Sequence, residues 1–285
     1  MKDTKNTPVE IPVSKLHPFE GHPYKVIDNE EMNFLIDSIQ TQGILSPLII
    51  RPLENTENEY EVVSGHRRLY AAMKAGLETV PAFIYAMDRD AASIAVVDSN
   101  LHREHILPSE KAFAYKMKFD AMSHQGKTSC QVGTKSRTDV QIAESANDSA
   151  RQIQRYIRLT HLIPELLQWM DEGKMALSVG VELSFLPDHF QHDVYEICKS
   201  NDCTPSYSQS WHLHQYCKDG TLDTELIFQT LSAEKANQRE TIKVPMDRLR
   251  KYIPKNYTQQ QAVDYLVKAA DYLNRYLRRQ REQQR

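Results

Sequence analysis

Arg67 and Arg68 closely follow Gly65, where a predicted strand turns into a predicted helix. β-favouring residues fill 60–63, and apolar residues recur at helical spacing between Leu69 and Gly76. Each guanidinium is a rigid fork of N–H donors, and a helix start adds free backbone N–H groups and a positive dipole end. This corner therefore predicts an anion site suited to a phosphate chain. The same residues also fit an ordinary corner with two solvated arginines.

A second group of arginines, Arg151, Arg155 and Arg158, recurs at i, i+4 and i+7 on a predicted helix, flanked by Gln152 and Gln154. Arginine pairs with guanine edges or phosphates and glutamine with adenine, so this stripe carries the side chains that a helix in the DNA major groove uses. A solvated basic face on a packed helix is the alternative. With the first residue of the helix, the predicted DNA contacts are Ser149, Arg151, Gln152, Gln154, Arg155 and Arg158.

The stripe lies in a predicted helix-turn-helix, with helices at 138–146 and 149–161 and a two-residue turn between them. Each helix begins with capping-box spacing, and the two pairs are Thr138 with Gln141 and Ser149 with Gln152. The paired caps, the short turn and the polar segment 123–137, which we predict to be a linker, favour DNA binding over a solvated face.

The arginine corner lies in a region of short strands and helices, which predicts a small mixed α/β domain over 1–107. Asp28 is expected to cap its first helix and Gly43 to end it. An all-α domain with the helix-turn-helix is predicted over 108–236, and a C-terminal helical segment over 237–285, so the fold class is α+β. Strands are predicted at 10–16, 47–53, 59–63 and 80–85, and helices at 28–43, 66–76, 88–104, 108–122, 138–146, 149–161, 164–172, 175–186, 188–199, 206–218, 223–236 and 258–285.

Composition fits a cytoplasmic protein. The chain has 285 residues, 26% charged, a net charge of −3 and four cysteines, with no apolar run as long as a membrane span and no secretory signal. Seven histidines and cysteines within 189–217 match no zinc spacing, and we read them as helix residues. Basic segments at 123–158 and 274–285 suggest confined contacts with a polyanion. The last helix has a two-heptad apolar seam that would serve self-association or packing, formed by Val263, Leu266, Ala270, Leu273 and Leu277.

Four ordered motifs resemble the ParB/RepB partition family, whose N-terminal fold is also similar to sulfiredoxin. The proline loop 17–23 stands where the family has its Asn-Pro and Gln-Pro-Arg segment, and 43–48 resembles its Gly-Ile-x-x-Pro-Leu. Residues 64–68 resemble the family's Gly-Glu-Arg-Arg box and 98–104 its Glu-Asn-x-x-Arg box, followed by the helix-turn-helix.

The resemblance implies a protein that binds a centromere-like site on double-stranded DNA and binds CTP with Mg²⁺ in its N-terminal domain. CTP would close a homodimer into a clamp that slides on DNA, with a Walker-type ParA ATPase as partner and the nucleoid or a plasmid as location. By position, Gly65, His66, Arg67 and Arg68 would hold the triphosphate. Asn100 and Arg103 would contact phosphate or Mg²⁺, with Asn100 as the metal ligand. Gly43 and Ser46 would lie near the cytosine.

Two departures from the family pattern bear on hydrolysis. His66 replaces the usual glutamate of the arginine box, and Ser99 replaces the acidic residue before Asn100. Because Mg²⁺ prefers charged oxygen ligands, we expect CTP hydrolysis to be slow or absent, and no catalytic residue is assigned.

This pattern also bears on two other classes of function, a DNA-binding regulator and an enzyme. A site-specific repressor or nucleoid-occlusion-like protein would use the same parts without a segregation role. Sulfiredoxin chemistry needs a cysteine in the arginine box, and no cysteine precedes Cys130. A serine-kinase-like activity would leave the helix-turn-helix unexplained.

Overall fold

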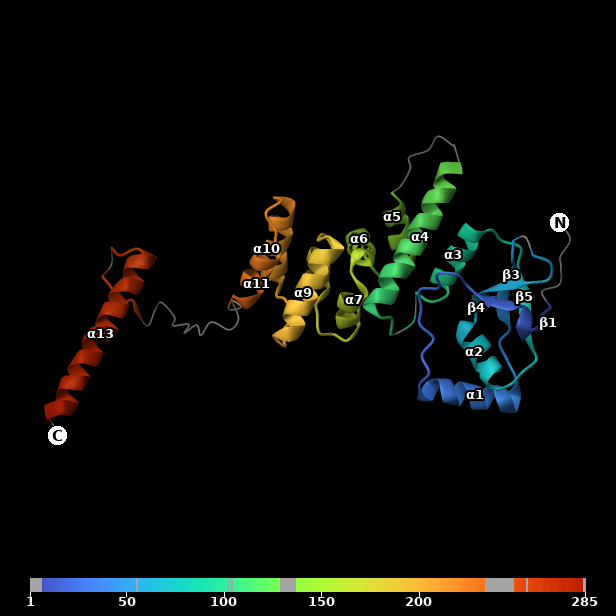
Figure 1. Ribbon diagram of the computed structural model, residues 1–285, viewed down its shortest axis with the longest axis horizontal. Coiled ribbons are helices and arrows are strands. Elements are labelled where there is room, and N and C mark those ends of the chain that lie inside the picture. The colour runs from blue at the N-terminus through green and yellow to red at the C-terminus, as the bar shows by residue number, and fades with distance from the viewer. Residues whose placement is uncertain are drawn as a thin grey trace. The chain divides into compact units, whose positions relative to one another are not determined.

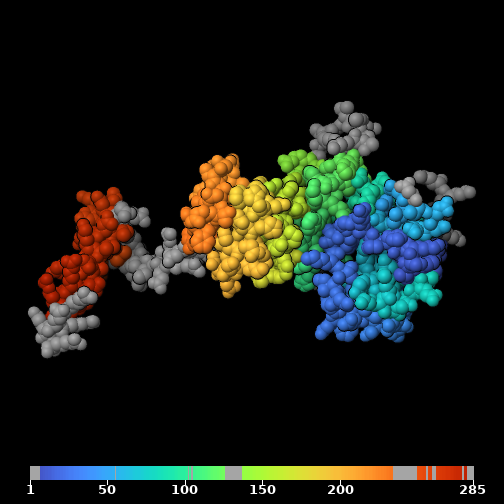
Figure 2. All heavy atoms as spheres, viewed as in Figure 1, coloured from blue at the N-terminus to red at the C-terminus, as the bar shows by residue number. Residues whose placement is uncertain are grey.

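The computed structural model describes residues 7–54, 56–101, 103, 105–128, 137–233, 249–254 and 256–283. The chain divides into two compact units, Met1–Ala233 and Glu234–Arg285. In Figure 2 the atoms of the first unit form one continuous body from the N-terminal strands to the orange helices. None of the helices in the described ranges has both the length and the apolarity needed to cross a membrane.

A five-stranded mixed sheet forms the N-terminal part of the first unit (Figure 1). The strands are β1 (Val9–Pro12), β2 (Leu16–Pro18), β3 (Leu48–Pro52), β4 (Tyr60–Ser64) and β5 (Thr79–Ile84), in the spatial order β1-β5-β3-β4-β2. β1–β5 and β3–β4 pair antiparallel, whereas β2–β4 and β3–β5 pair parallel.

The prediction of one strand over 10–16 was wrong. A 3₁₀ turn at Val13–Lys15 breaks it, and β1 and β2 then pair at opposite edges of the sheet. Ile11 and Leu16 on either side of the turn still enter the same core, which is why the apolar pattern looks continuous in the sequence.

Alternation along β4 places helices on both faces of the sheet. Val62 packs with Leu69 of α2 (His66–Lys74), whereas Val63 packs with Ala92 and Val96 of α3 (Arg89–Asp98). α1 (Glu30–Gln42) packs on α2 and ends as predicted at Gly43, which has a φ of +71°. Its cap is Asn29 and not the predicted Asp28, because the Asn29 side chain accepts the Met32 N–H. α3 ends six residues earlier than the predicted residue 104.

Among the described residues after β5, the first unit contains helices and no further strand, and the predicted α+β class is confirmed. Its elements are α4 (Pro108–Thr128), α5 (Thr138–Ser145), α6 (Ala150–Arg158), the 3₁₀ turn Leu159–His161, α7 (Pro164–Asp171), α8 (Leu177–Leu183), α9 (Asp188–Ser200), α10 (Tyr207–Lys218) and α11 (Thr224–Ser232). In the second unit, α13 spans Gln259–Gln283.

Two predictions near the helix-turn-helix need correction. α4 continues to Thr128, so the first part of the predicted linker 123–137 is helical, and 129–136 lies outside the described residues. A glycine at 126 costs an established helix only about 1 kcal/mol, too little to end it. Arg137 and not Thr138 is the cap residue of α5, and it makes no side-chain cap bond.

Candidate nucleotide site and nucleic-acid interface

The corner between β4 and α2 needs a glycine. Gly65 has a φ of +106°, a conformation that L side chains rarely adopt, and it is the cap residue of α2. A Cβ there would lie 3.1 Å from Leu48 Cγ and 3.2 Å from Arg68 Nη2. The tight bend places the two arginines of the box in the first turn of α2, as the sequence predicts.

Arg68 is committed to the segment before β3. Its Nη1 donates to the carbonyl oxygens of Ser46 and Pro47, the latter over 2.8 Å, and to Ser46 Oγ over 3.0 Å. Burial lowers the pKa of Arg68. The predicted nucleotide segment 43–47 and the arginine box are thus brought together through Arg68.

Arg67 and Arg103 form the more open part of the site. Arg67 is 38% exposed, and its Nη2 lies 3.3 Å from Glu31 Oε2, whose side chain is 74% exposed. Arg103 lies over the Tyr24 ring, with Cζ 5.6 Å from the centroid. Burial first and then the charge of Arg67 lower the pKa of Arg103. Both guanidinium groups are at least partly exposed, so a bound anion would interact favourably with either of them.

His66 braces the proline loop. Its ring lies 3.7 Å from that of His22, and its Nε2 accepts the Phe19 N–H over 3.3 Å. Burial, followed by the neighbouring His22 and Arg103, lowers the pKa of His66 to about 3. His66 is therefore neutral near pH 7 and accepts a backbone hydrogen bond, a role the sequence did not reveal.

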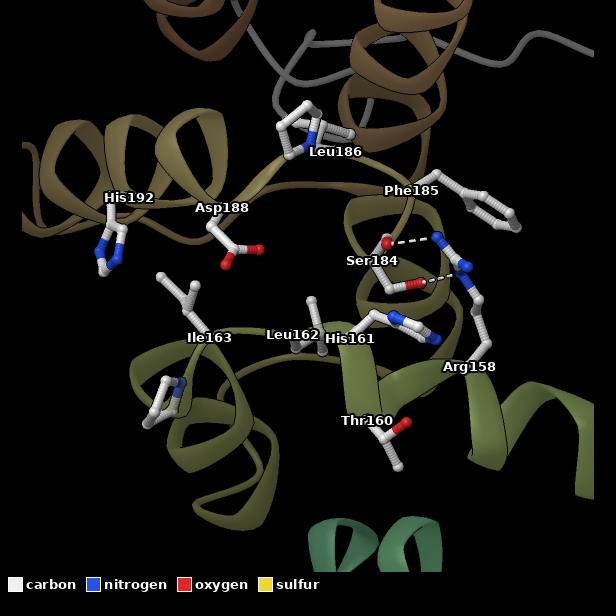
Figure 3. Close-up of a pocket in the computed structure, with 12 residues that line it drawn as sticks. Arg158, Thr160, His161, Leu162, Ile163, Ser184, Phe185, Leu186, Asp188 and His192 are labelled. Atoms are coloured by element: carbon white, nitrogen blue, oxygen red, sulfur yellow. Dashed lines mark hydrogen bonds between the residues drawn. The ribbon is translucent and has the colours of Figure 1, made fainter. Parts of the chain in front are cut away.

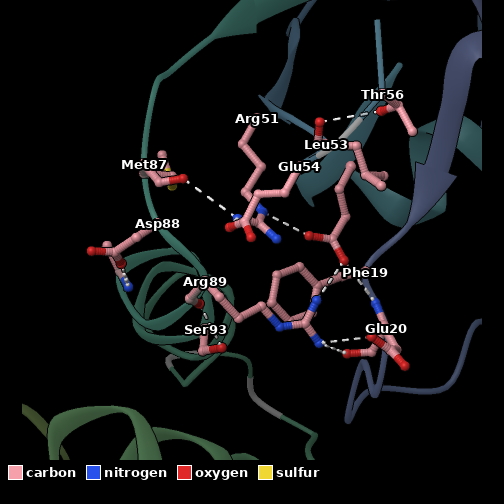
Figure 4. Close-up of polar contacts among 12 residues, drawn as sticks. Phe19, Glu20, Arg51, Leu53, Glu54, Thr56, Met87, Asp88, Arg89 and Ser93 are labelled. Carbon is pink, nitrogen blue, oxygen red and sulfur yellow. Dashed lines mark hydrogen bonds and ion pairs between the residues drawn. The ribbon is translucent and has the colours of Figure 1, made fainter. Parts of the chain in front are cut away.

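A buried carboxylate anchors the other side of the same loop (Figure 4). Glu61 accepts Arg51 Nε over 2.7 Å, Arg89 Nη1 over 2.8 Å and the Glu20 N–H over 3.0 Å. Arg89 also donates to the Glu20 carbonyl over 2.7 Å and lies 4.3 Å from the Phe19 ring centroid. This network was not predicted from the sequence, although a Glu and an Arg at facing strand positions 61 and 51 are its signal.

Asn100 is buried beside the end of α3. Its Nδ2 donates to the Val96 carbonyl over 2.7 Å and to Ser99 Oγ over 3.1 Å. Asp98, the nearest acid in the sequence, lies 2.6 Å from the buried ammonium of Lys118 on α4. In the described part of the chain, no group of three or more His, Cys, Asp or Glu residues is placed to hold a metal ion. Glu104, in the same motif, lies outside that part.

The two short helices of the helix-turn-helix pack on α4. Tyr115 of α4 forms a buried cluster with Ile142 and Ile153. The turn between the helices is fixed by Asp148, whose Oδ2 accepts Tyr115 Oη over 2.6 Å and lies 2.5 Å from Lys111 Nζ. Ser149 caps α6 as predicted, accepting the Gln152 N–H over 3.3 Å.

The predicted DNA-contacting residues on α6 divide into two groups. Arg151 and Gln154 are exposed, and Arg155 is half-buried with its Nη1 3.4 Å from Gln152 Oε1. Arg158 at the end of the helix instead donates to Ser184 after α8. It lines a pocket of about 590 Å³, shown in Figure 3.

The N-terminal domain matches a known family, and the chain is similar to chromosome-partitioning proteins. Residues 1–101 match the ParB N-terminal domain family. The chain is 34% identical over 169 residues to the chromosome-partitioning protein Spo0J of Thermus thermophilus, covering 59% of this chain and 56% of the relative. It is 36% identical over 115 residues to the nucleoid occlusion protein of a Geobacillus species, covering 40% of each. The chain thus spans about half the length of the curated relatives it matches.

Two solved structures are similar to parts of the chain. The C-terminally truncated ParB of Caulobacter crescentus, complexed to the centromeric parS site, is 23% identical with a TM-score of 0.43, covering 73% of this chain and 98% of that chain. Sulfiredoxin from Arabidopsis thaliana is 24% identical with a TM-score of 0.27, covering 31% of this chain and 96% of its own.

Proposed function

We propose that this chain, whose residues 1–101 form a ParB N-terminal domain, is a sequence-specific partition protein. It binds a centromere-like site on double-stranded DNA and uses CTP binding to form a sliding clamp. The observation that carries the proposal is the pairing, within one compact unit, of the arginines at the Gly65 corner with a helix-turn-helix that bears exposed Arg151. The relatives named chromosome-partitioning proteins support it.

Arg67 and Arg103 would hold the triphosphate, together with the free N–H groups at the start of α2. Bound CTP would supply negative charge to both guanidinium groups, of which Arg67 otherwise lies 3.3 Å from the largely exposed Glu31 carboxylate. Arg68 would act indirectly, because its bonds to Ser46 and Pro47 hold the segment that we propose to face the base. Gly43 and Gly65 give the backbone its turns at either end of this arrangement.

Mg²⁺ would be held mainly by phosphate oxygens, with the Asn100 side chain as the protein's ligand. Ser99 carries no charge, and the Asp98 carboxylate forms an ion pair with Lys118. The donor set suits nucleotide binding better than hydrolysis, because a hard cation needs charged oxygens to orient an attacking water. We therefore infer a clamp that binds CTP and releases phosphate slowly. Rapid phosphate release in the presence of cognate DNA would contradict this.

DNA would be read by the N-terminal part of α6, through Ser149, Arg151, Gln152, Gln154 and Arg155. We retain the division into residues 1–107 for nucleotide binding, 108–236 for DNA binding and 237–285 for self-association. A homodimer and a ParA-type ATPase complete the proposed system.

The test is to sequence the DNA bound to the full chain in cells and to compare it with the DNA bound to the Arg103→Ala variant. A sliding clamp gives a peak at its site with shoulders extending along the DNA, and the variant keeps the peak but loses the shoulders. Lys218→Ala, which removes an exposed cation far along the chain, is the matched control and should keep both features.

A site-specific repressor or nucleoid-occlusion-like protein is the second candidate, favoured by the similarity to nucleoid occlusion proteins. The binding profile also bears on this alternative. A sharp peak without shoulders in both proteins would identify a plain repressor.

A further inference from the structure

The side chain of Arg158, the last residue of α6, makes hydrogen bonds within the protein. Arg158 Nη2 donates to the Ser184 carbonyl oxygen over 2.6 Å, and its Nε donates to Ser184 Oγ over 3.2 Å. Its Cζ lies 4.1 Å from the centroid of the Phe185 ring. Figure 3 shows the guanidinium reaching Ser184 by both bonds, close to Phe185. Two of the five N–H donors of Arg158, the one on Nε and one on Nη2, are therefore already engaged within the protein.

The Phe185 ring carries a partner on each face. The ring of His214 on α10 lies parallel to it, with centroids 4.2 Å apart and planes 2° apart. A guanidinium and an imidazole each about 4 Å from one centroid would overlap on the same face, so Phe185 lies between them. His214 Nδ1 is 2.7 Å from Glu182 Oε2, and both side chains are largely buried. We call Arg158, Phe185, His214 and Glu182 the Phe185 stack.

The stack rests on a rigid support. Ser184 is 2% exposed, and its Oγ donates to the Val181 carbonyl over 2.7 Å. Close packing at Gly180 of α8 adds a second link, since a Cβ there would lie 2.5 Å from Met170 Sδ and 3.2 Å from Leu159 Cδ2. Leu159 directly follows Arg158, so the end of α6 is fixed to α8 on both sides of that peptide bond.

We infer that Arg158 positions α6 on its DNA rather than contacting the DNA, and that the Phe185 stack holds Arg158 in place. The inference rests on the proposed DNA-binding function. Arg155 and Arg151 lie about one and two helical turns before Arg158 on the same stripe. A small rotation of α6 would move the ends of these long side chains by more than a hydrogen bond tolerates, so sequence discrimination depends on how the end of the helix is anchored.

The first experiment compares Phe185→Ala with Phe228→Ala in the full chain. Both remove a phenyl ring from the surface of the same unit, at 43% and 49% exposure, but Phe228 on α11 lies outside the stack. Wild-type protein first selects a duplex from a random DNA library, and affinities are measured for that duplex and a scrambled one. Phe185→Ala should lower the ratio of the two affinities about tenfold with little change on the scrambled duplex, and Phe228→Ala should leave the ratio unchanged.

The salt dependence separates positioning from direct contact. Removing a phosphate contact lowers the slope of log affinity against log salt by about 0.9. Arg158→Ala should leave that slope at the wild-type value while reducing the discrimination between the two duplexes. Arg158→Lys should restore part of the discrimination, because lysine can make one bond to Ser184. Arg158→Lys also serves if the alanine variant does not fold. A slope reduced by about one unit, or Phe185→Ala discrimination equal to wild type, would overturn the inference.

The same measurements tell the two proposals apart. If the wild-type chain selects no sequence, the proposed DNA-binding function fails. If it selects one and the Phe185 variant discriminates equally well, only the role of the stack fails.

Discussion

Gly65 combines a positive φ with a crowded Cβ direction, so substitution there has two separate costs. We predict that Gly65→Ala lowers the free energy of unfolding by about 2–3 kcal/mol, from backbone strain and from contact with Leu48 Cγ. Nucleotide affinity should fall with it, because Arg68 lies against the same position. Urea unfolding followed by circular dichroism measures the first effect and calorimetric titration with CTP the second.

Gly76→Ala is the control for this substitution. Gly76 has a φ of +77°, but a methyl group added there would have no atom within 4 Å, so only the strain of about 1 kcal/mol applies. Equal losses of stability in the two variants would show that close packing at the corner contributes nothing.

His66 predicts a pH dependence of stability. Its pKa is about 3 in the folded chain against 6.5 unfolded, so between these values the unfolded chain binds a proton that the folded chain does not. The contribution of His66 to the free energy of unfolding is therefore fully present above pH 6.5. It is lost as the pH falls, and the loss is about 1–2 kcal/mol at pH 5. His66→Gln keeps an acceptor for the Phe19 N–H without titrating and should flatten this part of the profile. The exposed His161→Gln should not, and equal slopes in both variants would contradict the assignment.

The sequence predicted most residues of the candidate site, but it did not predict which of their side chains bind other parts of the protein. The Gly65 corner and the two arginines follow from a strand, a glycine and a helix in succession. The commitment of Arg68 to Ser46 and of Arg158 to Ser184 depends on segments far away in the chain. Local spacing contains no information about such partners.

At the scale of elements, α4 connects the two halves of the first unit. Lys118 on α4 is 3% exposed, and its Nζ lies 2.6 Å from Asp98 Oδ1 at the end of α3 and 2.8 Å from Ser145 Oγ at the end of α5. We predict that Lys118→Met destabilises the unit by about 1–2 kcal/mol. The loss stays moderate because Asp98, with 47% of its side chain exposed, can be rehydrated.

Lys116→Met on the same helix is the matched control. Lys116 pairs with Asp120 one turn away, and both side chains are more than 40% exposed, so its loss should change stability by about 0.5 kcal/mol or less. Thermal unfolding followed by circular dichroism compares the two. If the two variants melt together, Lys118 does not tie α3 to α5.

The elements themselves were largely predictable, and their errors have physical causes. The helices from α6 to α11 lie close to their predicted bounds, because capping residues, prolines and glycines mark their ends. The errors at β1 and at the end of α4 arise where tertiary packing decides. A 3₁₀ turn keeps Ile11 and Leu16 in one core, and an established helix extends through a glycine.

At the scale of the whole molecule, the second unit raises the question of self-association. The helix α13 exposes much of its apolar seam within the single chain, with Val263, Leu273 and Leu277 at 50%, 56% and 42%. Large apolar side chains at heptad spacing are stabilised when a second helix covers them. A clamp also needs its two subunits tied together at some point, and this seam offers one.

We predict that the full chain is a dimer without nucleotide and that Leu273→Glu makes it a monomer. The substitution would place a carboxylate inside the seam, where a partner helix would desolvate it. Tyr272→Glu is the matched control, since Tyr272 neighbours Leu273 but lies off the seam and is 75% exposed. Light scattering over a range of protein concentrations measures the mass of each variant. A seam of two heptads forms a weak coiled coil. The wild-type dimer should therefore begin to dissociate at a higher protein concentration than a dimer held by a long coiled coil would. A dimeric Leu273→Glu protein would place the subunit contact outside α13, and a monomeric wild-type chain would leave CTP as the agent that joins the subunits.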